Sequence, residues 1–185
     1  MEVYSPREDS FLLVDCILSE DLSGKDCLDM GCGSGVESVA LIRVNAKSVL
    51  AVDINEDALK ETKKRVESFF PKKNLGFFKV KESNLFDSVN GKFDFIAFNP
   101  PYVPTSEIKW VDLDGGVRGR EVIDVFISKV GSYLNKNGVL LLLISSLNCE
   151  EEVVSLLKEN GFVVSVVARK KLFFEELIVL RGVKS

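Results

Sequence analysis

The tetrapeptide Asn99-Pro100-Pro101-Tyr102 carries the groups best suited to holding an NH2 group. Its two prolines fix the backbone and remove two N–H donors, so the carbonyl oxygens of Asn99 and Pro100 and the Asn99 side-chain oxygen remain as acceptors. Tyr102 adds a flat face on which a planar amide or base can stack. A proline turn that merely ends a strand is the alternative interpretation. The predicted catalytic residues are Asn99, Pro100, Pro101 and Tyr102, and the predicted substrate contacts among them are Asn99, Pro100 and Tyr102.

The chemistry that this arrangement supports is transfer of a methyl group to a planar nitrogen. An amide nitrogen is a weak nucleophile because its lone pair is delocalised, and holding both of its protons orients it and relieves part of that conjugation. Transfer in line from a sulfonium requires positioning more than acid or base catalysis. The chain has no histidine, the commonest general base, so a reaction of this kind suits it.

A second constellation, Asp29-Met30-Gly31-Cys32-Gly33-Ser34-Gly35, has the pattern of a nucleoside-binding turn between a strand and a helix. Glycines let the backbone approach a ligand, and the helix N-terminus offers free amides. Asp53 follows at about the 20-residue distance from which an acid reaches ribose hydroxyls. Asp29 would repel a pyrophosphate but attract the amino or sulfonium end of S-adenosylmethionine. A generic tight turn is the alternative. The predicted cofactor contacts here are Asp29, Gly31, Cys32, Gly33, Gly35, Asp53 and Ile54, joined by Asn99.

Apolar runs that suit buried parallel strands alternate with segments of helical period, which predicts a doubly wound α/β sheet. We expect one helix to begin at Ser5, which forms a capping box with Glu8. Two further helices are expected to begin at Asn55 and at Asn148, each as a cap. The tetrapeptide follows the fourth strand, at the edge where such sheets bind ligands. The expected strands are residues 26–30, 48–52, 76–80, 93–98 and 139–145, then a hairpin of 162–168 and 173–180 with Arg169-Lys170-Lys171 at its tip.

Residues 103–120 form a connection that is too long and too polar for a simple turn, and Trp110 lies within it. We therefore predict a substrate-facing loop. Arginine beside glycine suits a grip on a peptide backbone, whereas a solvated loop is the alternative interpretation. The predicted substrate contacts in this loop are Gly115, Gly116, Arg118 and Arg120.

Length and composition fit a single domain spanning residues 1–185, with residues 1–24 as an N-terminal cap helix. The formal net charge of −4 argues against unaided binding to a phosphate backbone. The four cysteines lack paired spacing and histidine is absent, so no metal site is expected. No apolar run could cross a bilayer and no cleavable apolar segment opens the chain, so we expect a soluble, cytoplasmic protein.

The order of Asp29–Gly35, Asp53 and Asn99–Tyr102 along the chain resembles that in the HemK/PrmC-type class I methyltransferases. These enzymes modify the glutamine of release-factor Gly-Gly-Gln motifs. The stretch Val3–Leu13 resembles the opening of the eukaryal and archaeal branch of that family, and Asp114–Glu121 resembles the loop of that branch after its Asn-Pro-Pro-Tyr motif. The resemblance implies a Rossmann-like sheet of seven strands with an antiparallel last strand. It also implies N5-methylation of a release-factor glutamine, with S-adenosylmethionine as cofactor and S-adenosylhomocysteine as product.

The resemblance further implies cofactor contacts outside the glycine turn. Where the family has an aspartate, this chain has Asn84, which also suits a tight turn. Glu8 and Asp9 equally suit the first turn of a helix. The bacterial members carry an N-terminal helical domain for which this chain has no room. The implied contacts are Tyr4, Pro6, Glu8 and Asp9, closing over the cofactor, and Asn84 and Leu85 near the adenine.

Relatives in this branch work with a small zinc-ribbon activator protein that pairs along the third strand. Phe77 and Phe78 lie in the predicted edge strand here, and adjacent aromatics on an edge favour a cover or a partner. Because neighbouring strand residues face opposite sides, one of the two is expected in the core.

Two other functions compete with this prediction. A methyltransferase for N6 of adenine or another nucleic-acid amino group would need a recognition element, which the chain lacks. A non-catalytic subunit that only binds S-adenosylmethionine is disfavoured by the intact tetrapeptide and Asp29.

Overall fold

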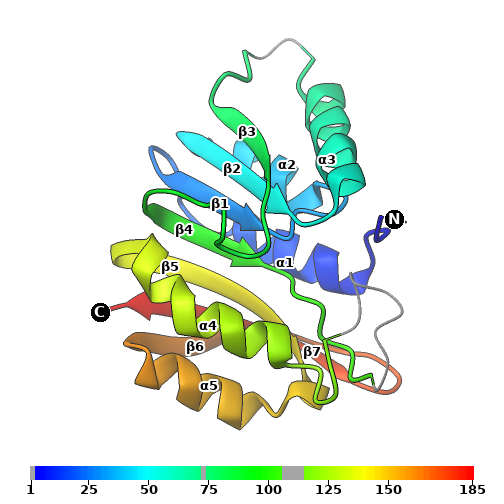
Figure 1. Cartoon of the computed structure of the whole chain (residues 1–185), viewed down its shortest axis with the longest axis vertical. Coiled ribbons are helices and arrows are strands. Elements are labelled where there is room, and N and C mark those ends of the chain that lie inside the picture. The colour runs from blue at the N-terminus through cyan, green and yellow to red at the C-terminus, as the bar shows by residue number, and fades with distance from the viewer. Residues whose placement is uncertain (1–2, 72–73, 106–114) are drawn as a thin grey trace.

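The computed structural model describes residues 3–71, 74–105 and 115–185, so Trp110 and Asp114 lie outside the described residues. A seven-stranded sheet forms the centre of the molecule (Figure 1). Neighbouring strands are parallel from β3 to β5, and β7 runs antiparallel to both β5 and β6. This confirms the predicted seven-stranded sheet with an antiparallel last strand. Its order is β3 (Phe78–Glu82), β2 (Ser48–Asp53), β1 (Asp26–Met30), β4 (Phe93–Phe98), β5 (Leu134–Ser145), β7 (Glu176–Lys184), β6 (Phe162–Lys171).

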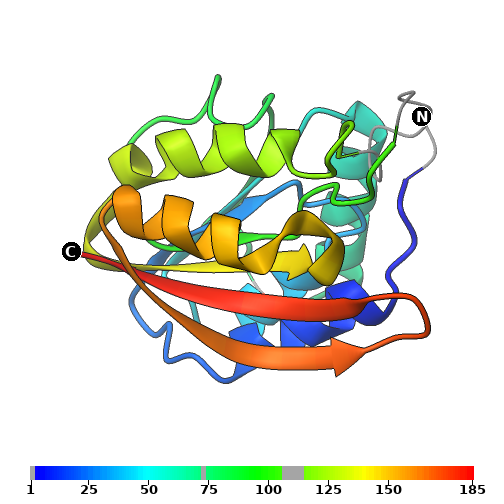
Figure 2. The same cartoon turned by 90° about the horizontal axis from the view of Figure 1, so that it is seen from below.

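Five α-helices lie on the two faces of the sheet in the described part of the chain. Helices α4 and α5 pack side by side on one face, and α1 and α2 cover the other, with α3 against α2 (Figures 1 and 2). Within the described ranges, no helix is long and apolar enough to span a membrane. The helices are α1 (Glu8–Leu18), α2 (Val36–Arg43), α3 (Glu56–Phe69), α4 (Glu121–Tyr133) and α5 (Glu150–Glu159), and a 3-10 turn, η1, spans Ser146–Asn148.

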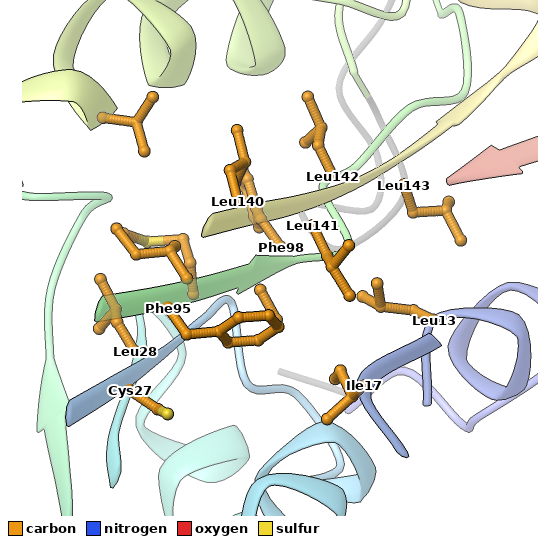
Figure 3. Packing of buried hydrophobic residues seen from close by; sticks show 14 of the residues in the cluster. Leu13, Ile17, Cys27, Leu28, Phe95, Phe98, Leu140, Leu141, Leu142 and Leu143 are labelled. Carbon is orange, nitrogen blue, oxygen red and sulfur yellow. The ribbon is translucent and has the colours of Figure 1, made fainter. Parts of the chain in front are cut away.

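The central strand β5 is apolar on both sides because helices cover both faces of the sheet. Successive side chains alternate, so Leu140 and Leu142 point toward α4, whereas Leu141 points toward Leu13 and Ile17 of α1 (Figure 3). All five side chains are fully buried. This packing fixes α1 against the sheet and thereby positions the start of that helix beside the end of β4.

Two of the predicted helix caps are wrong. Helix α1 begins at Glu8 after Arg7, with no side-chain cap, so Ser5 does not start it. Asn55 does cap α3, because its side chain accepts from the backbone N of Asp57 at 3.0 Å. Asn148 does not cap α5, which begins after Cys149. The Asn148 side chain is buried and bonds to three backbone groups in other turns, as described below.

The predicted starts of two strands are also wrong. Strand β3 begins two residues late, at Phe78, because the backbone N of Phe78 closes a turn onto the carbonyl of Leu75 at 2.9 Å. Strand β5 begins at Leu134, and Asn137 adopts a left-handed conformation within it, with φ 61°.

The tip of the C-terminal hairpin differs most from the prediction. Arg169-Lys170-Lys171 continues β6 and pairs with Ile178, Leu177 and Glu176, so the turn falls at Leu172–Glu175. The pairing register shifts between Val166 and Ala168, and ion pairs from Arg169 to Glu150 and Glu176 hold the end of the strand. As a result, Phe173 and Phe174 lie in the turn rather than in a strand.

Candidate active site

A pocket of about 1000 Å³, including its open mouth, lies at the carboxyl edge of the sheet. This size falls within the range of cofactor sites, roughly 300–1,000 Å³. It brings together predicted residues that are up to about 100 positions apart in the chain. The predicted residues that line the pocket are Tyr4, Asp9, Gly31, Cys32, Gly33, Asp53, Ile54, Asn84, Leu85, Asn99, Pro100, Pro101 and Tyr102. The lining residues that sequence analysis missed are Ser10, Met30, Ser34, Glu37, Ser83, Phe98 and Val122.

The glycine turn brings backbone to the pocket wall. Gly31 and Gly33 have φ of 64° and 46°, in the left-handed region that glycine favours. A Cβ added to Gly31 would lie 3.1 Å from the ring of Phe98, so the turn fits closely over the end of β4. Gly35 does not line the pocket, and a Cβ there would lie 2.8 Å from Cα of Thr62. Its direct effect is therefore to let α2 approach α3.

Asp53 closes the glycine turn from the end of β2. Its two carboxylate oxygens accept from the backbone N of Gly33 at 2.9 Å and of Asn55 at 2.8 Å. Burial raises the pKa of Asp53, while these amide donors act in the opposite direction. Each oxygen retains a further acceptor site, so the carboxylate can both shape the turn and bind a hydroxyl in the pocket.

Two more carboxyl groups form the acidic end of the site. Asp29 lies behind the pocket and does not line it; Ser38 Oγ donates to its carboxylate. Burial raises the pKa of Asp29 to about 7, with a further contribution from the negative charge of Asp53. Glu37 lines the pocket, and burial, followed by the charge of Asp29, raises its pKa. Sequence analysis missed Glu37 because an acid in the first turn of a helix is common for dipole reasons alone.

Asp9 links the N-terminal segment to the tetrapeptide. Its buried carboxylate accepts from the hydroxyl of Tyr4 at 3.0 Å, from the hydroxyl of Tyr102 at 3.3 Å and from Nδ2 of Asn99 at 3.3 Å. The backbone N of Ser10 adds a fourth donor at 2.7 Å. Burial, followed by the charge of Asp9, raises the pKa of both tyrosines, so their hydroxyls remain protonated donors.

The side-chain amide of Asn99 has one engaged end and one open end. Nδ2 donates to Asp9 and lies 3.5 Å from Ser10 Oγ. Oδ1 is buried and has no hydrogen-bond partner among the described residues. A buried acceptor without a donor costs about 1–3 kcal/mol. Because Asp9 fixes the amide orientation, this oxygen is oriented to accept a hydrogen bond from a ligand NH2 group.

Comparison with known proteins decides the family. The model of the family named Methyltransferase small domain matches residues 7–174. A chain of Methanocaldococcus jannaschii named as a protein N5-glutamine methyltransferase is 45% identical, over 98% of this chain and 91% of that relative. The chain belongs to this family of methyltransferases. The human methyltransferase HEMK2 is 31% identical, over 100% of this chain and 91% of its own length.

A solved structure agrees with this assignment. A chain of the E. cuniculi Mtq2–Trm112 complex, which is responsible for methylation of the eRF1 translation termination factor, superposes with a TM-score of 0.79. The two are 30% identical, and the match covers 100% of both chains. The methyltransferase is therefore an enzyme, and membership of this family implies the use of S-adenosylmethionine as methyl donor.

In this methyltransferase, the described part of the loop that follows the tetrapeptide packs closely against the backbone of the tetrapeptide. The backbone N of Gly115 donates to the carbonyl of Val103 at 2.9 Å. A Cβ on Gly119 would lie 2.5 Å from the carbonyl oxygen of Tyr102. Asn148 Nδ2 donates to the carbonyls of Tyr102 and Gly119 at 2.8 and 2.7 Å, so one side chain joins the loop to the tetrapeptide.

Several predicted site residues of the methyltransferase lie outside the pocket wall. Arg120 is buried and pairs with Asp124 and Glu152, and Arg118 pairs with Glu152 at the surface. These contacts give both arginines a role in holding the loop against α4 and α5. The predicted residues that do not line the pocket are Pro6, Glu8, Asp29, Gly35, Gly115, Gly116, Arg118 and Arg120.

Proposed function

We propose that this methyltransferase transfers a methyl group to the side-chain nitrogen N5 of the glutamine in the Gly-Gly-Gln motif of a translation release factor. The observation that carries the proposal is the buried, unpartnered Oδ1 of Asn99, whose amide orientation is fixed by Asp9. A primary amide presents two protons, and an oriented acceptor of this kind fits one of them. The relative in the Mtq2–Trm112 complex supports a termination factor as the substrate.

The pocket suits S-adenosylmethionine. Bound there, this cofactor supplies an electrophilic methyl group, and S-adenosylhomocysteine is the product. The backbone of Gly31 and Gly33 allows close approach, and Asp53 suits ribose hydroxyls. A bound amino or sulfonium cation would favour the charged form of the Glu37 carboxyl group in the wall, and the two charges would then attract each other. The other direct cofactor contacts that we propose are Tyr4, Asp9, Cys32, Ile54, Asn84, Leu85 and Asn99, all of which line the pocket. Pro6, Glu8, Asp29 and Gly35 lie outside its wall and would act by supporting it.

The tetrapeptide positions the acceptor nitrogen. Asn99 Oδ1 and the carbonyl of Pro100 accept hydrogen bonds from the two N–H groups of the amide, which orients the nitrogen and weakens its conjugation. The nitrogen takes the methyl group from the sulfonium and loses one proton to water. Tyr102 provides a face beside the planar amide and holds Asp9 through its hydroxyl. Positioning of this kind supplies the catalysis without an acid or base side chain. It agrees with a chain that contains no histidine.

The flanking segments complete the proposed assignment within a single domain. We assign residues 1–24 as the cap over the cofactor and residues 103–120 as the substrate loop. In this loop, Gly115 and Gly116 bring backbone close to the tetrapeptide, and Arg118 is exposed beside it. An extended substrate segment would contact this loop as it enters, and the buried Arg120 would act indirectly by holding the loop in place through Asp124 and Glu152.

A small zinc-ribbon activator along β3 is the proposed partner. Strand β3 ends the sheet, and no described strand pairs with its outer side. Phe77 and Phe78 are partly buried and pack against the core, so they stiffen this edge. The presence of Trm112 in the complex of the structural relative supports a second chain for this methyltransferase.

The test is methylation of a purified release factor by S-adenosylmethionine, followed by mass spectrometry, with the activator present. We expect one methyl group on the Gly-Gly-Gln glutamine. Asn99→Ala should lower the rate about 10²–10³-fold, the loss typical of one oriented group in a transition state, and should weaken cofactor binding far less. Full activity of Asn99→Ala, or methylation of oligonucleotides but not of release factor, would contradict the proposal.

A further inference from the structure

The turn between β6 and β7 exposes two aromatic rings. Phe173 and Phe174 are 91% and 87% exposed, the highest values among the large hydrophobic side chains that the structure describes. Their rings meet edge to face, with centroids 4.6 Å apart. Neither ring belongs to the core. An exposed apolar pair of this size marks an interaction site more often than a structural one.

The turn is held firmly despite the exposure of its rings. The backbone N of Leu172 donates to the carbonyl of Glu175 at 2.8 Å, and the backbone N of Glu176 donates to Ser146 Oγ at 3.0 Å. Arg169 pairs with Glu150 and Glu176 at the base of the turn. A fixed support lowers the entropy lost when a partner binds, so the pair is preorganised for contact.

Three hydrogen bonds connect this turn to the tetrapeptide. Glu175 accepts from Ser145 Oγ, the backbone N of Ser145 donates to Asn148 Oδ1 at 2.7 Å, and Asn148 Nδ2 donates to the carbonyl of Tyr102 at 2.8 Å. Strand β6 is parallel to β5, so its end reaches the same edge of the sheet. Figure 2 shows the turn on the side of the molecule where the N-terminal segment also lies.

Two further exposed apolar side chains lie on segments that hydrogen bonds join to this turn. Leu147, in η1 between Ser145 and Asn148, is 47% exposed. Val117, in the loop after the tetrapeptide, is 74% exposed. With Phe173 and Phe174 these residues define an apolar rim supplied by three separate segments.

We propose that the apolar rim, Leu147, Val117, Phe173 and Phe174, docks apolar side chains of the protein substrate on one side of the acceptor glutamine. The inference rests on the proposed function and specifies which surface selects the substrate. A polypeptide extends about 3.3 Å per residue, so side chains several positions from the acceptor reach beyond the pocket. The carboxylates of Glu150, Glu175 and Glu176 offset the charges of Arg169, Lys170 and Lys171 at the turn. The turn therefore offers no net positive charge for a phosphate backbone, and its exposed rings suit a polypeptide.

The test compares three variants with the wild type, in the presence of the activator. Phe173→Ser/Phe174→Ser removes the aromatic pair, Phe173→Leu/Phe174→Leu keeps an apolar surface, and Val163→Ser changes an exposed valine at the other end of β6. Steady-state rates are measured against full-length release factor at saturating S-adenosylmethionine, and cofactor affinity is measured by calorimetry. Thermal unfolding checks that each variant is folded.

For the double serine variant we expect a KM for release factor about tenfold higher, with kcat within about threefold and cofactor affinity unchanged. The double leucine variant should recover most of the loss, and Val163→Ser should match the wild type. If the wild type is active and the serine variant keeps its KM, or loses kcat and cofactor affinity instead, the inference fails and the proposed function stands. If the wild type binds cofactor but methylates no release factor, the proposed function fails and the inference falls with it.

Discussion

The proposed role of the tetrapeptide in holding a substrate nitrogen depends on the orientation of a single amide group. In Asn99 the two ends of the amide are distinguished by their neighbours, because Nδ2 meets the carboxylate of Asp9 and Oδ1 meets no donor. Asp9 in turn receives the hydroxyls of Tyr4 and Tyr102. A carboxylate accepts but cannot donate, so this arrangement excludes the flipped amide.

Replacing Asp9 should therefore impair methyl transfer more than cofactor binding. Asp9→Asn leaves one acceptor oxygen where two are used and adds an NH2 group that competes for Asn99 Oδ1. We expect the single-turnover rate to fall about 10²-fold, as for loss of one oriented catalytic group. Ser10→Ala is the control, since its contact with Asn99 is long, at 3.5 Å, and its effect should stay within about threefold. Equal losses in the two variants would contradict this role for Asp9.

The buried acid Asp29 gives the ligand-free protein a pH-dependent stability. Burial raises its pKa to about 7 in the folded protein, above the ordinary value of 3.8, so between these values the folded state binds a proton that the unfolded state lacks. The free energy of unfolding should fall as pH rises from about 4 to 7, by up to about 1.4 kcal/mol per pH unit for one group. Glu37 and Asp53, whose pKa values are also raised, act in the same direction.

Denaturant unfolding of Asp29→Asn at pH 5, 6, 7 and 8 measures this contribution. We expect a shallower dependence than in the wild type, because the substituted amide takes up no proton. Asp15→Asn, on an exposed position of α1, is the matched control and should keep the wild-type slope. Identical slopes for Asp29→Asn and the wild type would show that Asp29 is charged in both states.

At the scale of elements, the chain positions the tetrapeptide by close contact between turns. Gly119 and Gly91 both adopt positive φ, at 68° and 87°, so alanine is strained at either position. An added Cβ meets the carbonyl of Tyr102 at 2.5 Å at Gly119, and nothing within 4 Å at Gly91.

Gly119→Ala should consequently be less stable than Gly91→Ala by about 1–3 kcal/mol, the usual effect of overpacking. It should also lower the methylation rate, because relief of the contact displaces the backbone of Tyr102. Chemical denaturation and initial rates measure the two effects. If both variants lost the same stability and kept full activity, the contact at Gly119 would not position the tetrapeptide.

The elements themselves show what sequence can and cannot predict. Strands β1, β2 and β4 were predicted almost to the residue, because burial on both faces produces an uninterrupted apolar run. The turn after β6 was misplaced, since its register depends on the irregularity between Val166 and Ala168, which has no local signal. Asn148 has the composition of a cap, but long-range backbone partners determine its position.

In the candidate site, too, sequence predicts the residues that have a local signal and misses those fixed by long-range contacts. Asp53 ends one strand and Asn99 directly follows another, so the topology alone predicts that they meet at one edge. Ser10 and Glu37 line the same pocket from helices, where polar residues in a first turn already have a local explanation. The bonds from Asp9 to the tetrapeptide cross about 90 positions of sequence and could be seen only in the fold.

For the whole molecule, the two ends of the sheet differ in what they can bind. Strand β6 is ten residues long and exposes Val163, Val166 and Val167. Strand β3 has five residues, with Lys79 and Lys81 exposed. Short strands and lysines protect an edge against self-association, but its outer amides remain available to a chosen partner. The β3 edge also lies at the end of the sheet opposite the Phe173–Phe174 turn, so an activator there would leave that turn free for substrate.

Hydrogen exchange can locate the activator on this basis. On adding a small zinc-ribbon protein, we expect amide exchange in Phe78–Glu82 to slow about tenfold or more, because strand pairing gives these amides new acceptors. Amides of β6 should exchange unchanged and serve as the internal control. Protection of β6 alone would move the partner to the other edge, where it would lie beside the aromatic turn and compete with the docking of substrate.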